Sequence, residues 1–315
     1  MSKVGGGRNF GWGKKMEWAG MQALREAFGE GRYATVAGHA ARWRRFCHWA
    51  RESGIRDVRQ VRRSDLAQFA EAMGRQVKDG MSTAYAKNLV TSANVVFESM
   101  RRDRVIWVKP GDFVRQRTLV RQTVPPGINR AVVNEAVSKL VESGKTRVAQ
   151  LAILCREFGL RRKEASLLDL RLARAQATSR GQINVIAGTK GGRGRSVDRW
   201  VPVSESGLRV VDSALQVAGS SGRLIPTNLS FAQWGSKVSH EWAAAAKLLG
   251  LGPIRDLRAA YACERYEQIT GRAPPVVAGQ RLIPKNADIQ ARRVLSEELG
   301  HNRIDVVAAY IGSGR

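Results

Sequence analysis

The chain has 315 residues, which is enough for two ordinary domains with buried cores. Hydrophobic residues make up 43%, a share that is typical of globular proteins and excludes a disordered chain. The 53 lysines and arginines against 27 acidic residues give a net charge of +26, spread along the whole sequence. This excess favours nucleic acid as a partner, and no long apolar span or basic amphipathic anchor points to a membrane.

The cysteines and the first residues indicate the cytoplasm. Cys47, Cys155 and Cys263 lie far apart and lack the spacing of zinc ligands, so we expect reduced, mostly buried thiols. Residues 1–8 lack the apolar run of a signal peptide. We expect a cytoplasmic, nucleoid-associated protein.

Residues 1–15 are glycine-rich and basic, which is typical either of a floppy terminus or of an arm lying on the DNA backbone. Segment 16–105 then shows the apolar spacing of helices near 17–28, over 34–51, from Ser64 or Asp65, and from Ser82 to about 100. We therefore predict a small helical DNA-binding domain over 16–105.

The predicted helix over 34–51 carries almost only positive charge outside its apolar stripe. Such a surface is usually only solvated, but the excess of one sign favours contacts with DNA phosphates. The predicted contact residues of this helix are Arg42, Arg44, Arg45 and Arg51.

Residues 106–127 show little periodicity and end in Pro125-Pro126-Gly127, which breaks both helix and strand. We predict a basic linker here, whose Arg115 and Arg117 contact DNA. The rest of the chain, 128–315, forms the second predicted domain.

The second domain alternates between helical and strand-like patterns. One helix is predicted from the apolar residues between Val148 and Cys155 and stops at Gly159, and others are predicted over 161–170, 230–249, 256–269 and 288–299. Apolar alternation over 183–187 and 200–203 predicts a β-hairpin with a long, flexible, basic tip. That tip carries Lys190, Arg193 and Arg195, and we predict that the two arginines contact DNA. The tip lacks the Gly-Lys-Ser/Thr ending of a nucleotide-binding loop. The predicted fold class is mainly α with a small β-sheet (α+β).

Four short motifs of this domain carry candidate chemistry, and each alone is weak. They are Phe158-Gly159-Leu160-Arg161-Arg162-Lys163-Glu164, Thr189-Lys190-Gly191-Gly192, Ile254-Arg255-Asp256-Leu257-Arg258, and Leu299-Gly300-His301 with Tyr310 nine residues later. Together and in this order, they resemble the tyrosine recombinase and phage-type integrase family. The resemblance covers the second domain in full and the helical domain loosely.

These residue types suit the breaking of a phosphodiester. A tyrosine nucleophile can stay attached to the DNA as a phosphotyrosine, which conserves the bond for rejoining. Arginines are always cationic and bidentate, which suits the negative charge that gathers on phosphate oxygens in the transition state. A lysine near other cations can donate a proton to the departing 5′-oxygen.

The resemblance implies a role for each matching residue. Arg161 and Arg258 clamp the scissile phosphate, and Lys190 is the general acid. His301 bonds the phosphate or steers the phenol, and Tyr310 attacks. Glu164 supports the site by orienting the arginine and the histidine.

Other interpretations of the same residues stay open. Arg161 can simply cap a helix, and Lys190 can be a solvated hairpin charge. His301 and Tyr310 can be packed ring residues. Tyr261 and Tyr266 are rival nucleophiles, although their place on the helix of Arg258 indicates packing.

Three features depart from the family pattern. Arg255 stands where the family has a histidine. Because arginine can only donate hydrogen bonds, we expect it to stabilise charge there; if the family role is that of a general base, His301 or water has to supply the base instead. Residues 271–287 resemble a loop insertion. Few residues follow Tyr310, so docking of the tail on a neighbouring subunit must be short or lie elsewhere.

The resemblance implies a site-specific DNA recombinase, with integration or excision of a mobile genetic element as the biological use. It implies double-stranded DNA as the partner, a homotetramer on paired sites, possible accessory DNA-bending proteins, and no metal or cofactor. Two alternatives are a DNA topoisomerase of type IB, which relaxes DNA without exchanging partners, and a catalytically inactive DNA-binding or architectural relative.

Overall fold

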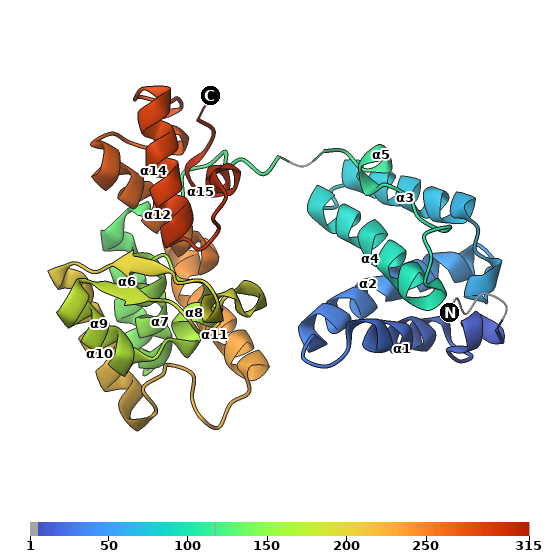
Figure 1. Cartoon of the computed structure of the whole chain (residues 1–315), viewed down its shortest axis with the longest axis horizontal. Coiled ribbons are helices and arrows are strands. Elements are labelled where there is room, and N and C mark those ends of the chain that lie inside the picture. Colours follow the sequence, from blue (N-terminus) through green and yellow to red (C-terminus); the bar gives the residue numbers. More distant parts are fainter. Residues whose placement is uncertain (1–5, 117, 315) are drawn as a thin grey trace. The chain divides into compact units, whose positions relative to one another are not determined.

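The computed structural model describes residues 6–116 and 118–314. The chain forms two compact units, unit 1 over Met1–Thr118 and unit 2 over Leu119–Arg315. Figure 1 shows both, with unit 1 coloured from blue to green. In the part of the chain that the structure describes, no helix is both long and apolar enough to cross a bilayer.

Unit 1 consists of helices joined by short turns (Figure 1). They are α1 (Met16–Phe28), α2 (Tyr33–Glu52), α3 (Arg63–Lys78), α4 (Thr83–Arg101) and the short α5 (Pro110–Phe113). Its core is built on aromatic rings: Phe46 meets both Phe69 and Phe97 edge-on, at centroid distances of 5.2 and 5.3 Å. Gly20 of α1 allows the close approach of Trp43 of α2, because a Cβ at Gly20 would lie 2.2 Å from the indole nitrogen.

Part of the segment predicted as a basic arm, 1–15, packs on unit 1. Residues Arg8–Gly11 form a short 3-10 turn in which Asn9 and Phe10 are buried. The backbone N–H of Asn9 donates to Asp57 Oδ1 at 2.9 Å, and its side-chain oxygen accepts from Val58 N at 3.0 Å. These bonds hold the segment on unit 1; residues 1–5 lie outside the described residues.

Residues at both ends of the segment predicted as a basic linker, 106–127, pack within the two units. Ile106, Val108 and Val114 are buried in the core of unit 1. On the other side of the division, Arg121 N donates to Ala308 O at 2.9 Å, and Gly127 is buried. Hydrophobic residues outnumber charged ones in this segment by eight to five, and the buried apolar side chains decide where it packs.

Unit 2 is mainly helical with one small sheet, which confirms the predicted fold class. Its helices are α6 (Arg130–Glu142), α7 (Thr146–Glu157), α8 (Arg162–Leu167), α9 (Leu170–Arg180), α10 (Glu205–Ala218), α11 (Phe231–Ala246), α12 (Arg255–Thr270), α13 (Pro275–Ala278), α14 (Lys285–Glu298) and α15 (Ala308–Ile311). Strands β1 (Gln182–Asn184) and β2 (Trp200–Pro202) pair antiparallel, with Ile183 opposite Val201.

The core of unit 2 centres on α7, which is buried along most of its length and packs against α6, α10, α11 and α12. Helix α12 in turn packs against α14 and α15. Segment 271–287, predicted as a loop insertion, contains α13 and the start of α14. It packs against the residues after Tyr310: Val276 lies against Gly312, and Arg281 Nη1 donates to Gly314 O at 2.5 Å.

Candidate active site

Tyr310 lies beside two of the predicted site residues. His301 Nε2 is 2.9 Å from the Tyr310 hydroxyl, and Arg258 Nε donates to the same hydroxyl at 3.3 Å. The guanidinium carbon of Arg258 also lies 5.5 Å from the centre of the Tyr310 ring. The phenol is therefore held by a base and a cation at once.

The turns that carry the site require glycine. Gly159 has φ +59°, and a Cβ there would lie 2.4 Å from the Tyr261 ring. Arg161 follows as the N-cap of α8, and its backbone N–H donates to Glu164 Oε2 at 2.7 Å, which satisfies one free N–H of the helix start. Gly300, with φ +64°, ends α14 and turns the chain into His301.

Glu164 is fully buried and gathers three arginines. Its carboxylate lies 2.5 Å from Arg161 Nη1, 2.7 Å from Arg199 Nη1 and 3.6 Å from Arg258 Nη1. Burial alone raises the pKa of a carboxyl group, but here the charges of Arg199, Arg258 and Arg161 outweigh it and lower the pKa of Glu164 to about 2. Three positive charges thus meet one negative charge.

His301 is neutral in this environment. Burial first, and then the charges of Arg258, Arg161 and Arg199, lower its pKa to about 4. Arg161 Nη2 and Arg258 Nη2 each lie 3.4 Å from His301 Nε2, and guanidinium nitrogens only donate. Nε2 is therefore the acceptor nitrogen, and the proton of the neutral ring belongs on Nδ1.

Lys190 lies at the hairpin tip, exposed, in the 3-10 turn over Lys190–Arg195. Together with Arg161, Arg199 and Gly300 it lines one small pocket. The tip is tied to α8 because Gly188 approaches the backbone of Lys163 so closely that a Cβ would lie 2.6 Å from its oxygen. The structure thus brings Lys190 to the rim of the site without a bond to Tyr310.

Arg255 is not brought into this cluster. It is exposed at the start of α12, and its side chain makes no hydrogen bond or ion pair with another described residue. It lines a separate pocket beside Trp242 and Lys247.

The rival nucleophiles are buried and engaged as donors. Tyr261 Oη donates to Glu298 at 2.8 Å, and Tyr266 Oη donates to Asp288 at 2.8 Å. Burial, followed by these carboxylates, raises the pKa of both phenols. Both tyrosines are packing residues, as their position on the helix of Arg258 indicated. The three cysteines are likewise buried free thiols.

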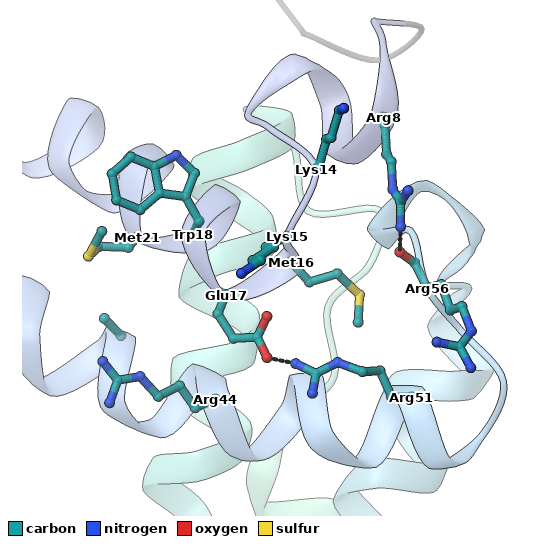
Figure 2. Close-up of a pocket in the computed structure, with 11 residues that line it drawn as sticks. Arg8, Lys14, Lys15, Met16, Glu17, Trp18, Met21, Arg44, Arg51 and Arg56 are labelled. Atoms are coloured by element: carbon teal, nitrogen blue, oxygen red, sulfur yellow. Dashed lines mark hydrogen bonds and ion pairs between the residues drawn. The ribbon is translucent and has the colours of Figure 1, made fainter.

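Unit 1 carries a basic pocket of about 660 Å³, shown in Figure 2. We call it the α1–α2 basic pocket. Its cationic lining residues are Arg8, Lys14, Lys15, Arg44, Arg51 and Arg56. The one acidic lining residue is Glu17, which pairs with Arg51, and Trp18 adds a half-exposed ring (Figure 2). The pocket therefore concentrates positive charge beside an aromatic surface.

The other predicted DNA-binding residues that the structure describes do not line this pocket. Arg42 lies on the opposite flank of α2, where Nη1 donates to Ser92 Oγ of α4 at 3.4 Å. Arg45 and Arg115 are exposed on unit 1, and Arg193 and Arg195 are exposed at the hairpin tip. Arg117 lies outside the described residues.

The sequence analysis missed Arg199, which is buried beside Glu164. It lies two positions beyond Val197 in an irregular stretch before β2, and no local motif marks it. A charged residue next to an alternating apolar strand is the only hint that the sequence offers.

Comparison with known protein families finds one match. Residues 119–264 match the family model described as Integrase. No curated protein sequence matches the chain.

Solved structures share the fold over nearly the whole chain. A XerH site-specific recombinase bound to palindromic difH substrate is 13% identical, with a TM-score of 0.60 over 96% of this chain and 82% of that one. The Tn1549 transposon integrase in complex with transposon right end DNA is 14% identical, with a TM-score of 0.57 over 93% and 95%. A lambda integrase tetramer bound to a Holliday junction is 15% identical, with a TM-score of 0.55 over 93% and 76%.

Proposed function

We propose that the chain is a tyrosine recombinase of the integrase family, a site-specific DNA recombinase that works through a covalent 3′-phosphotyrosine. The match of residues 119–264 to the Integrase family model and the fold shared with a XerH site-specific recombinase support this proposal. The observation that carries the proposal is the 2.9 Å contact of His301 Nε2 with the Tyr310 hydroxyl, beside Arg161 and Arg258. A nucleophile, an acceptor for its proton and two cations for a phosphate lie in one cluster.

The proton route follows from the donors and acceptors. Tyr310 Oη attacks the scissile phosphorus. The hydroxyl proton of Tyr310 passes to His301 Nε2, because the imidazole ring is neutral and this nitrogen carries no proton. The bond from phosphorus to the 5′-oxygen breaks as the bond from phosphorus to Tyr310 forms. Lys190 at the hairpin tip gives its proton to the departing 5′-oxygen. Rejoining runs the same steps in reverse.

The arginines stabilise the phosphorane-like transition state. Arg161 is the partly exposed member of the cluster, with 28% of its side chain accessible, so it meets the phosphate from DNA first. The side chain of Arg258 is 4% exposed, and its guanidinium group contacts the Tyr310 hydroxyl and His301 Nε2 from the buried side of the cluster. Glu164 orients both guanidinium groups and balances part of their charge.

Double-stranded DNA is the substrate and partner that we propose. The net charge of +26 and the α1–α2 basic pocket support backbone contacts by unit 1, and Arg193 and Arg195 support contacts by the hairpin. By likeness to the lambda integrase tetramer on a Holliday junction, we propose that four copies act on two paired sites, with accessory DNA-bending proteins where the sites demand them.

Two steps test the proposal against its alternatives. DNA trapped covalently on the chain is sequenced to find the target site, and a plasmid pair carrying that site is then assayed for exchange. A recombinase yields exchanged products, whereas a topoisomerase of type IB only relaxes the plasmid. An inactive relative binds DNA and traps none, which would refute the proposed activity.

A further inference from the structure

Unit 2 contains one more buried arginine in contact with the site, Arg199, whose side chain is 4% exposed. It is the residue just before β2, so it belongs to the hairpin and to neither of the turns that carry Arg161 and His301. Burying a guanidinium group costs free energy unless its donors meet acceptors. Its contacts therefore indicate what it does.

The three branches of Arg199 reach three segments. Nε donates to Glu298 O at 2.7 Å, Nη2 donates to Gly159 O at 3.4 Å, and Nη1 forms an ion pair with Glu164 Oε2 at 2.7 Å without the alignment of a hydrogen bond. Gly159 lies two residues before Arg161, and Glu298 lies three residues before His301. One planar group thus joins both turns.

The aliphatic part of Arg199 also shapes the second turn. A Cβ at Gly300 would lie 2.8 Å from Arg199 Cδ, so glycine is needed there for packing as well as for its φ of +64°. The glycine of the Leu299-Gly300-His301 motif therefore makes room for the Arg199 stem.

We propose that Arg199 is a positioning residue for the strand-cleavage step: its guanidinium group ties the Arg161 turn to the His301 turn and keeps their spacing before DNA binds. This inference rests on the proposed function. No hydrogen bond joins Arg199 to Tyr310 or to His301 among the described residues, so it acts through the groups that it holds.

The charge of Arg199 supports the same role. Apart from burial, it contributes most to the low pKa of Glu164, and it is one of three arginines that lower the pKa of His301. The other charged or titratable groups facing His301 are Arg161, Arg258, Glu164 and Tyr310. Loss of Arg199 removes one like charge from around the imidazole ring.

The test compares Arg199→Met with Arg156→Met in the full chain. Arg156 is 3% exposed, and it also donates to two carbonyls (Gly127 at 2.8 Å and Ile128 at 3.3 Å) and pairs with a carboxylate, Glu264. It does not contribute to the pKa of His301. It is therefore a matched control for the structural cost of losing a buried arginine.

Two readouts are measured: covalent adduct formation on supercoiled plasmid DNA, and the NMR titration of the His301 ring without DNA. We expect Arg199→Met to slow adduct formation about 100-fold at saturating DNA, the scale of a small misplacement of reacting groups, with little change in DNA affinity. His301 should titrate about one pH unit higher, the effect of losing one nearby like charge. Arg156→Met should leave both readouts unchanged.

Equal behaviour of Arg199→Met and Arg156→Met in both readouts would overturn the inference. Arg199→Lys keeps the positive charge but cannot reach all three partners, so it tests positioning even if Arg199→Met does not fold. It should form adducts at least about tenfold more slowly than the unchanged chain, and wild-type speed would refute the bridging role. If the unchanged chain forms no adduct, the proposed function fails, while the His301 titration still decides whether Arg199 acts on the ring.

Discussion

None of the described arginines of unit 1 is buried, whereas unit 2 buries Arg156, Arg199, Arg258 and Arg292. In the α1–α2 basic pocket, exposed cations face solvent and act by their number, since screening reduces each one. Around Glu164, buried cations act by their position, because each must be paired in a poorly solvated site. Substitutions should therefore have graded effects in unit 1 and severe ones in unit 2.

Among substitutions in unit 2, the largest loss of activity is expected at Tyr310. Tyr310→Phe keeps the ring against Arg258 and removes only the oxygen that attacks, so covalent adducts should vanish while DNA affinity stays within about twofold. Adducts are measured by denaturing gel after incubation with plasmid DNA.

Tyr261→Phe is the control for Tyr310→Phe, because it removes a buried hydroxyl that donates to Glu298. It should lower stability by about 1 kcal/mol and keep adduct formation. Adducts that persist in Tyr310→Phe would remove Tyr310 from the mechanism and return attention to Tyr261 and Tyr266.

Glu164→Gln should have the next largest effect, because it leaves three arginines without their common counter-charge. Removing one partner of a buried ion pair costs about 3–5 kcal/mol, and urea unfolding of unit 2 measures it. The pKa of Glu164 is lowered to about 2 in the folded chain, so its stabilisation is present above its ordinary value and is lost as pH falls toward 2.

The matched control for Glu164→Gln is Glu52→Gln in unit 1, whose carboxylate is 65% exposed beside His48. It should change stability by less than about 0.5 kcal/mol. Similar losses in the two variants would mean that burial does not distinguish the two units. The loss between pH 4.5 and 2 should also be weaker in Glu164→Gln, since the titrating group is gone.

The comparison also explains what the sequence could predict. The motifs around Arg161, His301 and Tyr310 are local, since each depends on a turn and a fixed spacing, and these residues do lie together. Arg199 meets Gly159 from 40 residues away and Glu298 from 99 residues away. The spacing of residues in a sequence does not reveal contacts between segments so far apart, so the role of Arg199 could not be predicted.

Several helices of unit 2 were not predicted, among them α6, α9, α10 and the short α13, and α9 and α10 show a different reason for this. Helix α9 buries only Leu170, Ala173 and Ala177 and has no continuous apolar stripe. Helix α10 contains Gly207 and β-branched valines, which have low helix propensity, and its start depends on the Ser204 cap. Tertiary packing against α7 stabilises α10 where propensity does not.

Arg255 tests whether an exposed arginine of unit 2 behaves like those of unit 1. It has no partner in the described cluster, yet it lies one helical turn before Arg258. We expect it to donate to phosphate, so Arg255→Ala should slow adduct formation about 100- to 1000-fold, the usual cost of one transition-state donor, and Arg255→His should keep most of the rate.

Lys247→Ala is the control for Arg255→Ala, because Lys247 lines the same pocket but belongs to no motif. It should cleave at the wild-type rate. If Arg255→Ala does so too, Arg255 is a bystander, and Arg258 alone supplies the cation of that helix.

The smallest effect is expected at Arg44 in the α1–α2 basic pocket. Arg44 is exposed and makes no ion pair with another described residue, so its loss costs no folding free energy through a broken contact. If it contacts one phosphate, Arg44→Ala should weaken binding to all DNA sequences alike. The slope of log affinity against log salt should fall by about 0.9, which is the contribution of one phosphate.

Glu17→Gln should strengthen DNA binding, because it removes the one acidic lining residue of that pocket and frees Arg51 from its ion pair. Fluorescence anisotropy of labelled duplex DNA over a range of salt concentrations measures both variants.

Arg42→Ala, on the other flank of α2, shows which side of the helix faces DNA. A salt slope that is unchanged in Arg44→Ala but reduced in Arg42→Ala would move the DNA contact to the α4 side. A reduced slope only in Arg44→Ala would assign it to the pocket, since a single phosphate contact cannot lie on both flanks of one helix.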